Sequence, residues 1–269
     1  MDLRRSAGGT SSHIGGVDLD VTRAGDGPTL LFLHGGYPAT RASADDPIVA
    51  HLASRFSVIA PTHPGFGVDP APAWMTTVDD LAFLYLDLLD TLGESNVTVV
   101  GCSFGGWVAA TVATMSTARI GALFLVGPLG IKVGDHQTRD IADIYSLTDA
   151  DLADVVFVDP QTHAARIAEM DNDALLLAAR SREATARYGW SPYLHDPKLK
   201  RRLARIDVAT QVVVGELDEL VVSGYAQAYA DAIADASLVI ISGCGHFPHI
   251  EEPKRLAELI AGEKPGEEQ

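Results

Sequence analysis

Short apolar segments alternate with longer amphipathic segments along most of the chain. Runs of four to seven residues that are apolar on both faces are typical of buried parallel strands. Each run here ends at a glycine or proline, or within two residues of one. The six predicted buried strands are 29–33, 56–60, 96–100, 120–126, 211–214 and 238–241.

Helical patterns lie between these strands. In residues 76–92, Leu81, Leu84, Leu88 and Leu92 share one helical face. Further predicted helices are 104–117, which is rich in small residues, 223–234 and 253–261. Strands alternating with helices predict an α/β fold with a doubly wound, mostly parallel sheet. Near the N-terminus, residues 17–21 alternate between apolar and polar and suit an antiparallel edge strand.

Residues 129–206 interrupt this alternation. They contain one strand-like run, 155–158, and are otherwise rich in charge and in helix formers. Insertions in open α/β sheets tend to lie over the carboxyl ends of the strands, where ligands bind. We therefore expect a core of residues 1–128 and 207–269, with residues 129–206 forming a helical cap over a pocket.

The charge balance narrows the range of partners. The 269 residues include 20 basic and 36 acidic side chains, for a formal net charge of −16. Such a field repels phosphate groups, which argues against nucleic acid and anionic membranes as partners. No apolar run is long enough to span a bilayer, and the basic N-terminus precedes no apolar stretch. We expect a cytoplasmic protein that acts on a small molecule, and its capacity to form homo-oligomers stays open.

The sequence contains two cysteines, Cys102 and Cys244. Two are too few for a disulfide scaffold, and their spacing resembles no metal site, so we expect neither metal nor cofactor. We interpret both as small buried hydrophobic residues. A sharper alternative is a redox-sensitive pair at the active-site rim.

A candidate nucleophile follows the third buried strand. Ser103 lies between Gly101 and Gly105, after a strand and before a helix, as a nucleophile elbow requires. The glycines permit a tight turn, and the helix start favours an oxyanion nearby. This context favours catalysis over a structural turn.

A serine hydroxyl needs a base, and the base needs an acid. His246 follows the last strand on a glycine-flanked loop, whereas the nearby His249 leads into a helix and suits a structural role. Asp218 follows the penultimate strand, with Glu216 and Glu219 as alternatives. The expected catalytic residues are Ser103, Asp218 and His246, in that chain order.

The first buried strand ends in His34-Gly35-Gly36-Tyr37. A backbone amide near Gly36 or Tyr37, together with the amide of Phe104, would form an oxyanion hole with two donors. We interpret His34 itself as a structural hydrogen-bonding residue.

Together these motifs resemble the α/β-hydrolase superfamily over nearly the whole chain outside residues 129–206. The resemblance rests on 34–36, on Pro64-Gly65-Phe66-Gly67, on the elbow at Ser103, on 215–218 and on Gly245-His246. It implies a cofactor-free mechanism in which Ser103 forms an acyl-enzyme that water then hydrolyses. Epoxide hydrolases and haloalkane dehalogenases carry aspartate at the elbow, so Ser103 argues against both.

Within the superfamily, we predict a hydrolase of small, mostly apolar esters or lactones. Meta-cleavage-product hydrolases, which cleave carbon–carbon bonds, usually carry asparagine before the serine and tryptophan after the histidine. Cys102 and Phe247 stand there in this chain, so this is the alternative. A third reading is a small-molecule receptor on the same fold that turns over slowly or not at all.

The pocket can be predicted only by residue type. Trp107, Tyr145, Trp190 and Phe247 are the candidate substrate contacts. Aromatic side chains around the site would make it apolar and favour uncharged acyl groups. Three arginines, Arg180, Arg182 and Arg187, could bind a carboxylate, but we interpret them as a solvated helix face.

Overall fold

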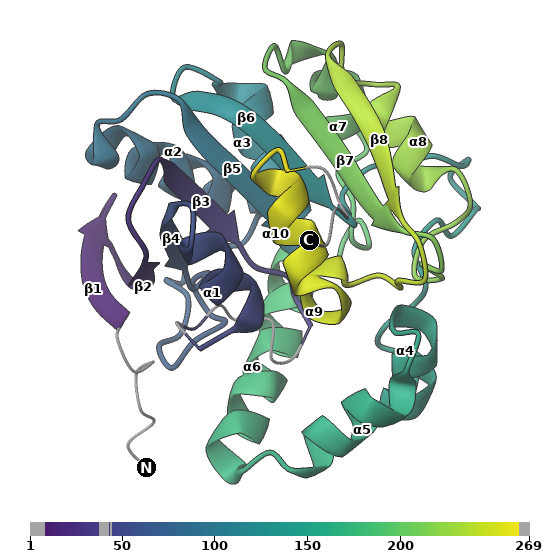
Figure 1. The fold of residues 1–269 in the computed structure, drawn as a ribbon. Helices are drawn as coiled ribbons and strands as arrows, with labels where there is room; N and C mark the ends of the chain where they lie inside the picture. The colour runs from purple at the N-terminus through teal and green to yellow at the C-terminus, as the bar shows by residue number, and fades with distance from the viewer. Residues whose placement is uncertain (1–8, 38–42, 44, 264–269) are drawn as a thin grey trace, which may run out of the picture.

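The computed structural model describes residues 9–37, 43 and 45–263 (Figure 1). These residues form one eight-stranded sheet in the order β1-β2-β4-β3-β5-β6-β7-β8. All pairings from β4 through β3 to β8 are parallel, whereas β1–β2 and β2–β4 are antiparallel. The strands are β1 (Gly9–Ile14), β2 (Val17–Ala24), β3 (Thr29–Leu33), β4 (Ser57–Pro61), β5 (Val97–Cys102), β6 (Ile120–Val126), β7 (Thr210–Gly215) and β8 (Ala236–Ile241).

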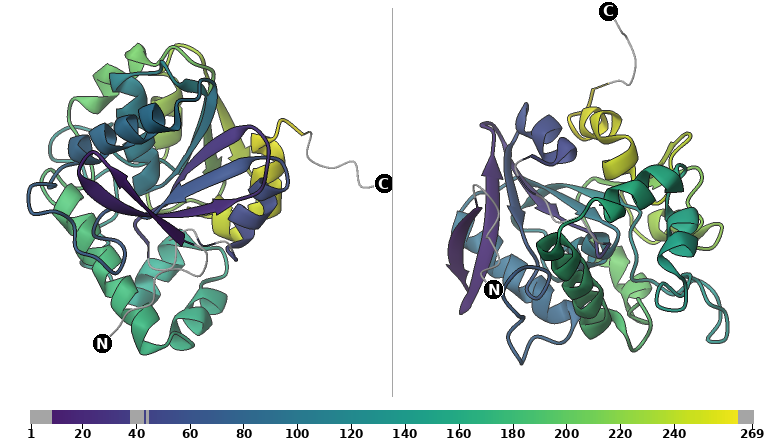
Figure 2. Two further views of the ribbon diagram at one scale, coloured as in Figure 1. Left: turned by 90° about the vertical axis from the view of Figure 1, so that its left-hand side faces the viewer. Right: turned by 90° about the horizontal axis from the view of Figure 1, so that it is seen from below.

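Helices cover both faces of this sheet (Figure 2). Strand β3 shows why, because Leu31 and Leu33 join the apolar core on one face while Leu30 and Phe32 join the core on the other. The first core contains α2 (Val78–Leu92), α3 (Phe104–Met115) and α8 (Tyr225–Ala230); the second contains α1 (Pro47–Ala53) and α10 (Pro253–Ile260). The doubly wound, mostly parallel α/β fold predicted from the sequence is therefore confirmed.

Local signals account for the start of α2. The side chain of Thr77 accepts a hydrogen bond from the amide of Asp80, and the Asp80 carboxylate accepts one from the amide of Thr77. This capping box satisfies two amide groups that the helix leaves without partners. The helix ends at Gly93 in the left-handed region, as glycine C-caps commonly do.

Between β6 and β7 the chain forms α4 (Asp149–Val156), α5 (Pro160–Ala168), α6 (Asn172–Gly189), α7 (Leu199–Arg202) and a short 3-10 helix (Leu203–Arg205). Figure 1 shows α4, α5 and α6 beyond the end of the sheet toward which the parallel strands point. The later part of this segment returns to the core, because Leu199, Leu203 and Ile206 are buried in the same cluster as α3.

Three sequence predictions were wrong in detail. Residues 155–158 form no strand, because Thr148 caps a helix that runs through Val156. Residues 17–21 lie in an antiparallel strand, but not at the edge, since β1 pairs outside it. Strand β1 was missed because its sequence is mostly polar. The helix predicted at 223–234 is shorter and covers Tyr225–Ala230.

Candidate active site

Ser103 lies between the end of β5 and the first residue of α3. Its φ of 52° and ψ of −113° belong to a region that non-glycine residues rarely adopt. The flanking glycines are required by close contacts: a Cβ on Gly105 would collide with the carbonyl oxygens of Leu33 and His34. A Cβ on Gly101 would likewise collide with the backbone of Gly105. The turn therefore holds the serine hydroxyl at the strand end without room for larger neighbours.

His246 lies on the loop after β8, and its side chain reaches Ser103. The Nε2 atom is 2.9 Å from the Oγ of Ser103, within hydrogen-bonding distance. The imidazole is fully buried. Of the two histidines considered from the sequence, the structure brings His246 to the serine and places His249 elsewhere.

Asp218 completes a chain of three side chains. Its Oδ2 is 2.8 Å from the Nδ1 of His246, and its side chain is 2% exposed. The second carboxylate oxygen accepts a hydrogen bond from the amide of Leu220, which orients the group. Glu216 and Glu219 are exposed, and Glu216 accepts from the amide of Gly243. Of the three acids, Asp218 is the one that contacts the histidine.

Contacts with α4 and α9 (Pro248–Glu251) position the histidine loop. The amide of His246 donates to the carbonyl of Val156 at the end of α4. The carboxylate of Glu251 accepts from the amides of Gly245 and Val158, both at 2.8 Å. Sequence reasoning missed Glu251, since nothing local in the sequence ties it to residue 158.

The three residues expected around an oxyanion, Gly36, Tyr37 and Phe104, line the same cavity as Ser103. Phe104 begins α3, so its amide is among the first four N–H groups that a helix leaves without an intrahelical acceptor. Helix α6 holds the opposite wall, because the hydroxyl of Thr185 donates to the carbonyl of Gly36. An oxyanion hole formed by these residues stays a prediction.

A buried histidine pair supports the loop after β3. The Nε2 of His34 accepts from the amide of His63, and the Nε2 of His63 lies 2.9 Å from the carbonyl oxygen of His34. The Nδ1 of His63 lies 2.5 Å from the hydroxyl of Tyr85. Burial holds the pKa of His63 well below its usual range, so its ring is neutral. These bonds agree with a structural role for His34.

The cavity beside Ser103 is small and mostly apolar. Its volume is about 40 Å³, and the side chain of Arg182 is the one charged group in its described lining. This volume is well below the ~300–1,000 Å³ of typical ligand pockets. The remaining apolar lining residues are Leu129, Ile144, Leu152, Val156, Leu194 and Leu220, with Phe247.

The predicted pocket residues divide into two groups. Phe247 lines the cavity, 4.7 Å from the His246 ring between centroids. Trp107 is buried behind Phe104, and Tyr145 forms an aromatic pair with the exposed Trp190. These three do not line the cavity. For Tyr145 and Trp190 the sequence could not show this, because the direction of a side chain in the 129–206 segment depends on how its helices dock.

The three arginines of α6 do more than form the solvated face that we expected: Arg187 is exposed and Arg180 and Arg182 are half-buried, but all three donate hydrogen bonds to backbone carbonyls. Arg180 donates to the carbonyl oxygens of Gly67 and Val68. Arg187 donates to three carbonyls in residues 72–75. Arg182 pairs with Asp149 and donates to a backbone carbonyl of residue 144. They tie α6 to the loop after β4 and to the start of α4.

Cys102 and Cys244 are both buried, both reduced, and both part of the apolar cluster on the α1 and α10 face. Burial raises the pKa of each thiol well above its usual value. Reactive cysteines have lowered pKa values, so these thiols fit the packing interpretation.

The order of the strands defines a class of α/β folds, and the comparison with known sequences identifies the family. The chain belongs to the alpha/beta hydrolase family, whose family model matches residues 30–259. The described residues include no helix long and apolar enough to cross a membrane, and no cluster of three or more side chains suited to a metal ion.

Individual relatives are hydrolases. The 2-hydroxymuconate semialdehyde hydrolase of Pseudomonas sp. (strain CF600) is 28% identical, over 91% of this chain and 89% of the relative. A 2-hydroxy-6-oxo-6-(2'-aminophenyl)hexa-2,4-dienoic acid hydrolase of Metapseudomonas resinovorans is 27% identical, over 91% and 87%.

Solved structures share the fold. The meta-cleavage product hydrolase of Pseudomonas fluorescens IP01 has a TM-score of 0.74 at 21% identity, over 94% of this chain and 96% of that one. The esterase RhEst1 of Rhodococcus sp. ECU1013 also has a TM-score of 0.74, at 18% identity, over 96% and 98%.

Proposed function

We propose that this protein is a serine hydrolase that cleaves a small, mostly apolar ester or lactone through an acyl-enzyme. The observation that carries the proposal is the hydrogen-bonded chain from Ser103 through His246 to Asp218, buried beside an apolar cavity. The Nε2 of His246 removes the proton of the Ser103 hydroxyl as its oxygen attacks the substrate carbonyl. Asp218 holds the imidazole in the required tautomer and stabilises the imidazolium that forms.

The negative charge that develops on the carbonyl oxygen needs donors. The amide of Phe104, with an amide of Gly36 or Tyr37, supplies them in this proposal. Collapse of the intermediate expels the alcohol, which takes the proton from His246. A water molecule, deprotonated in turn by His246, then hydrolyses the acyl-enzyme. In the proposed organisation, residues 129–206 are the cap that closes over this reaction.

Carbon–carbon bond hydrolysis is the second candidate, and the relatives favour it. By their names, one of the relatives compared by sequence is a hydrolase of 2-hydroxymuconate semialdehyde, and the other is a hydrolase of a hexa-2,4-dienoic acid. In this chain Arg182 is the charged group in the cavity that could pair with a substrate carboxylate. It is already bonded to Asp149, so such a substrate would have to displace that pair.

A substrate panel decides between the candidates. We expect an activated aryl ester to release a burst of about one equivalent of phenol, followed by slower steady turnover, as acyl-enzyme accumulates. Ser103→Ala should lower turnover by ~10⁴–10⁶. Turnover of a 2-hydroxy-6-oxodienoate faster than of every ester would favour the carbon–carbon reaction. A shift in melting temperature with ligands, without turnover of any substrate, would identify a receptor.

A further inference from the structure

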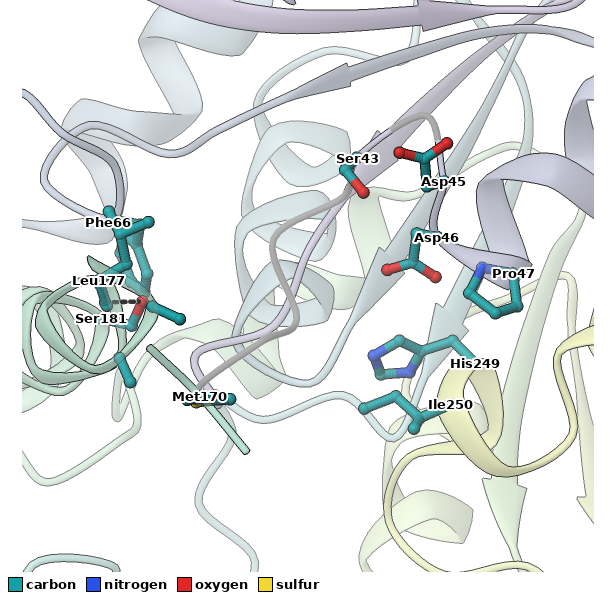
Figure 3. A pocket seen from close by; sticks show the side chains of 12 residues that line it. Ser43, Asp45, Asp46, Pro47, Phe66, Met170, Leu177, Ser181, His249 and Ile250 are labelled. Atoms are coloured by element: carbon teal, nitrogen blue, oxygen red, sulfur yellow. Dashed lines mark hydrogen bonds between the residues drawn. The ribbon is translucent and has the colours of Figure 1, made fainter. Parts of the chain in front are cut away.

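Two hollows in the surface lie apart from the candidate active site. One, of about 340 Å³, lies between α6 and α9 and is lined by His249 (Figure 3); it shares no described lining residue with the cavity beside Ser103. The other, of about 680 Å³, follows β8 and is lined by Leu238 and Ile240. This second hollow runs along the outermost strand of the sheet, which is the kind of surface that pairs with another strand.

The backbone of β8 has a free side. Among the described residues, β7 is the one strand that pairs with β8, which therefore forms an edge of the sheet (Figure 1). The carbonyl of Ile241 accepts from the amide of Glu216, so Ile241 faces the β7 side. Backbone groups alternate in direction along a strand, so Ala236, Leu238 and Ile240 turn their N–H and C=O groups outward. This row of donors and acceptors is a template for an added strand.

The sequence of β8 does not protect this edge. Exposed edge strands are commonly protected by charged residues, by proline or by a bulge. Residues 236–241 contain no charge and no proline, and all six pair with β7 in an unbroken register. Ile240 is 54% exposed, and it lines the hollow together with the partly exposed Val222. The opposite edge, β1, is mostly polar, so β8 is the edge that favours association.

The charges at the two ends of β8 are opposite in sign. Asp235, immediately before the strand, is exposed. Arg255 of α10 lies at the other end, where its guanidinium donates to the carbonyl of Ser242. Asp235 alternates in step with Val239 and Ile241, which pack in the core on the α10 face, so its side chain lies on the face that carries Arg255. An antiparallel copy of this strand therefore brings each negative end beside a positive end.

We propose that a second copy of this chain pairs with β8 in antiparallel orientation, about a twofold axis through Leu238. In this register Leu238 lies opposite its symmetry mate, and Ala236 lies opposite the partner's Ile240, a small residue against a large one. Asp235 of each copy lies beside the partner's Arg255. Such an interface uses the same surface on both copies, as twofold dimers do. The proposal concerns association and does not depend on the hydrolase function.

Sedimentation velocity over a wide range of protein concentrations tests the association. We expect a monomer–dimer equilibrium for the wild type. Ile240→Lys places a charge at the interface and should raise the dimer dissociation constant about tenfold or more, with little change in melting temperature because Ile240 is exposed. Phe83→Lys is the matched control, since Phe83 is 61% exposed on α2 and should leave the dimer intact. A wild type that stays monomeric, or a dimer that Ile240→Lys leaves unchanged, would overturn the proposal.

Charge reversal tests the antiparallel orientation. Asp235→Arg and Arg255→Asp should each raise the dissociation constant about tenfold, because each places like charges together at both ends of the interface. The double variant restores opposite charges and should recover most of the wild-type affinity. Arg119→Asp, which changes the net charge equally at an arginine paired with Asp90, should have little effect. A double variant as weak as either single variant would contradict the orientation.

Cysteine substitutions report the register. The Cα atoms of directly opposed, hydrogen-bonded residues in antiparallel strands lie ~5.5 Å apart, within the range of a disulfide. Leu238→Cys is opposed to itself in the proposed dimer and should cross-link on oxidation, whereas Ile240→Cys, although more exposed, should not. The native Cys102 and Cys244 are buried, so the wild type serves as the blank. Cross-linking through residue 240 in preference to 238, or no cross-link through 238, would overturn the proposal.

Discussion

Replacing Ser103 with glycine should stabilise the protein relative to replacing it with alanine. Both changes remove the hydroxyl and its bond to His246, so the difference between them reports the backbone. A non-glycine residue with φ of 52° and ψ of −113° carries ~1–3 kcal/mol of strain, which glycine relieves. Glycine also gives up ~0.4–1 kcal/mol through the greater freedom of the unfolded chain. The two ranges bound the difference between ~0 and ~2.6 kcal/mol, and we expect a net gain of about 1.3 kcal/mol for glycine over alanine.

Thermal and urea unfolding would measure this difference. In domains of roughly this size, ~1 kcal/mol shifts the melting temperature by about 2–4 °C. Ser116 offers the control, because it caps the end of α3 in ordinary extended backbone, at φ of −158° and ψ of 132°. There alanine should be the more stable of the pair. If Ser103→Gly is no more stable than Ser103→Ala, the elbow is not strained and the reasoning fails.

Three further predictions concern His249, Glu251 and the two cysteines. His249 has a pKa of about 3 in the folded protein against ~6.5 when unfolded, so the unfolded state binds the extra proton and stability falls as pH drops from about 6.5 toward 3. In that pH range, His249→Gln should reduce the slope of the unfolding free energy against pH, measured by urea denaturation, by up to ~1.4 kcal/mol per pH unit. An unchanged slope would contradict the burial argument. Glu251→Gln leaves one of the two bonded amides without an acceptor, so it should lower the free energy of unfolding by ~1–3 kcal/mol and lower kcat more than it raises KM. The control Glu252→Gln, at an exposed residue, should change neither the stability nor the kinetic constants. Cys102 and Cys244 should react with a thiol reagent only on unfolding, and rapid modification of the native protein would reopen the redox alternative.

Periodicity was enough to predict most of the fold. Runs such as 29–33 are apolar on both faces because helices cover both faces of the sheet. A continuous apolar run in the sequence therefore indicates a buried strand. Strand β1 lacked the signal, since a polar edge strand needs only backbone pairing with β2. The valines at 155 and 156 suggested a strand because β-branched residues favour strands. Instead, these valines end a helix that Thr148 caps and that the preceding helix-forming residues favour.

The candidate triad could be predicted because each member lies at or in the loop that follows a parallel strand, and such strands end at one edge of the sheet. The pocket could not. Its walls come from α4 and α6, whose docking depends on bonds such as those of Arg180 and Arg187 to distant carbonyls. No local pattern shows that Val156 faces Ser103 while Tyr145 faces Trp190.

Hydrogen bonds anchor two parts of the α4–α6 segment to the rest of the protein and leave the part between them less constrained. The end of α4 is tied to the histidine loop through Val156 and Glu251, and the second half of α6 is tied to residues 67–75 through its arginines. Among the described residues, no side-chain hydrogen bond joins residues 172–179 of α6 to the sheet or its loops. Substitutions in these turns should alter which molecules are admitted while the reacting groups keep their geometry. Directed evolution of substrate range would therefore best begin with the first turns of α6.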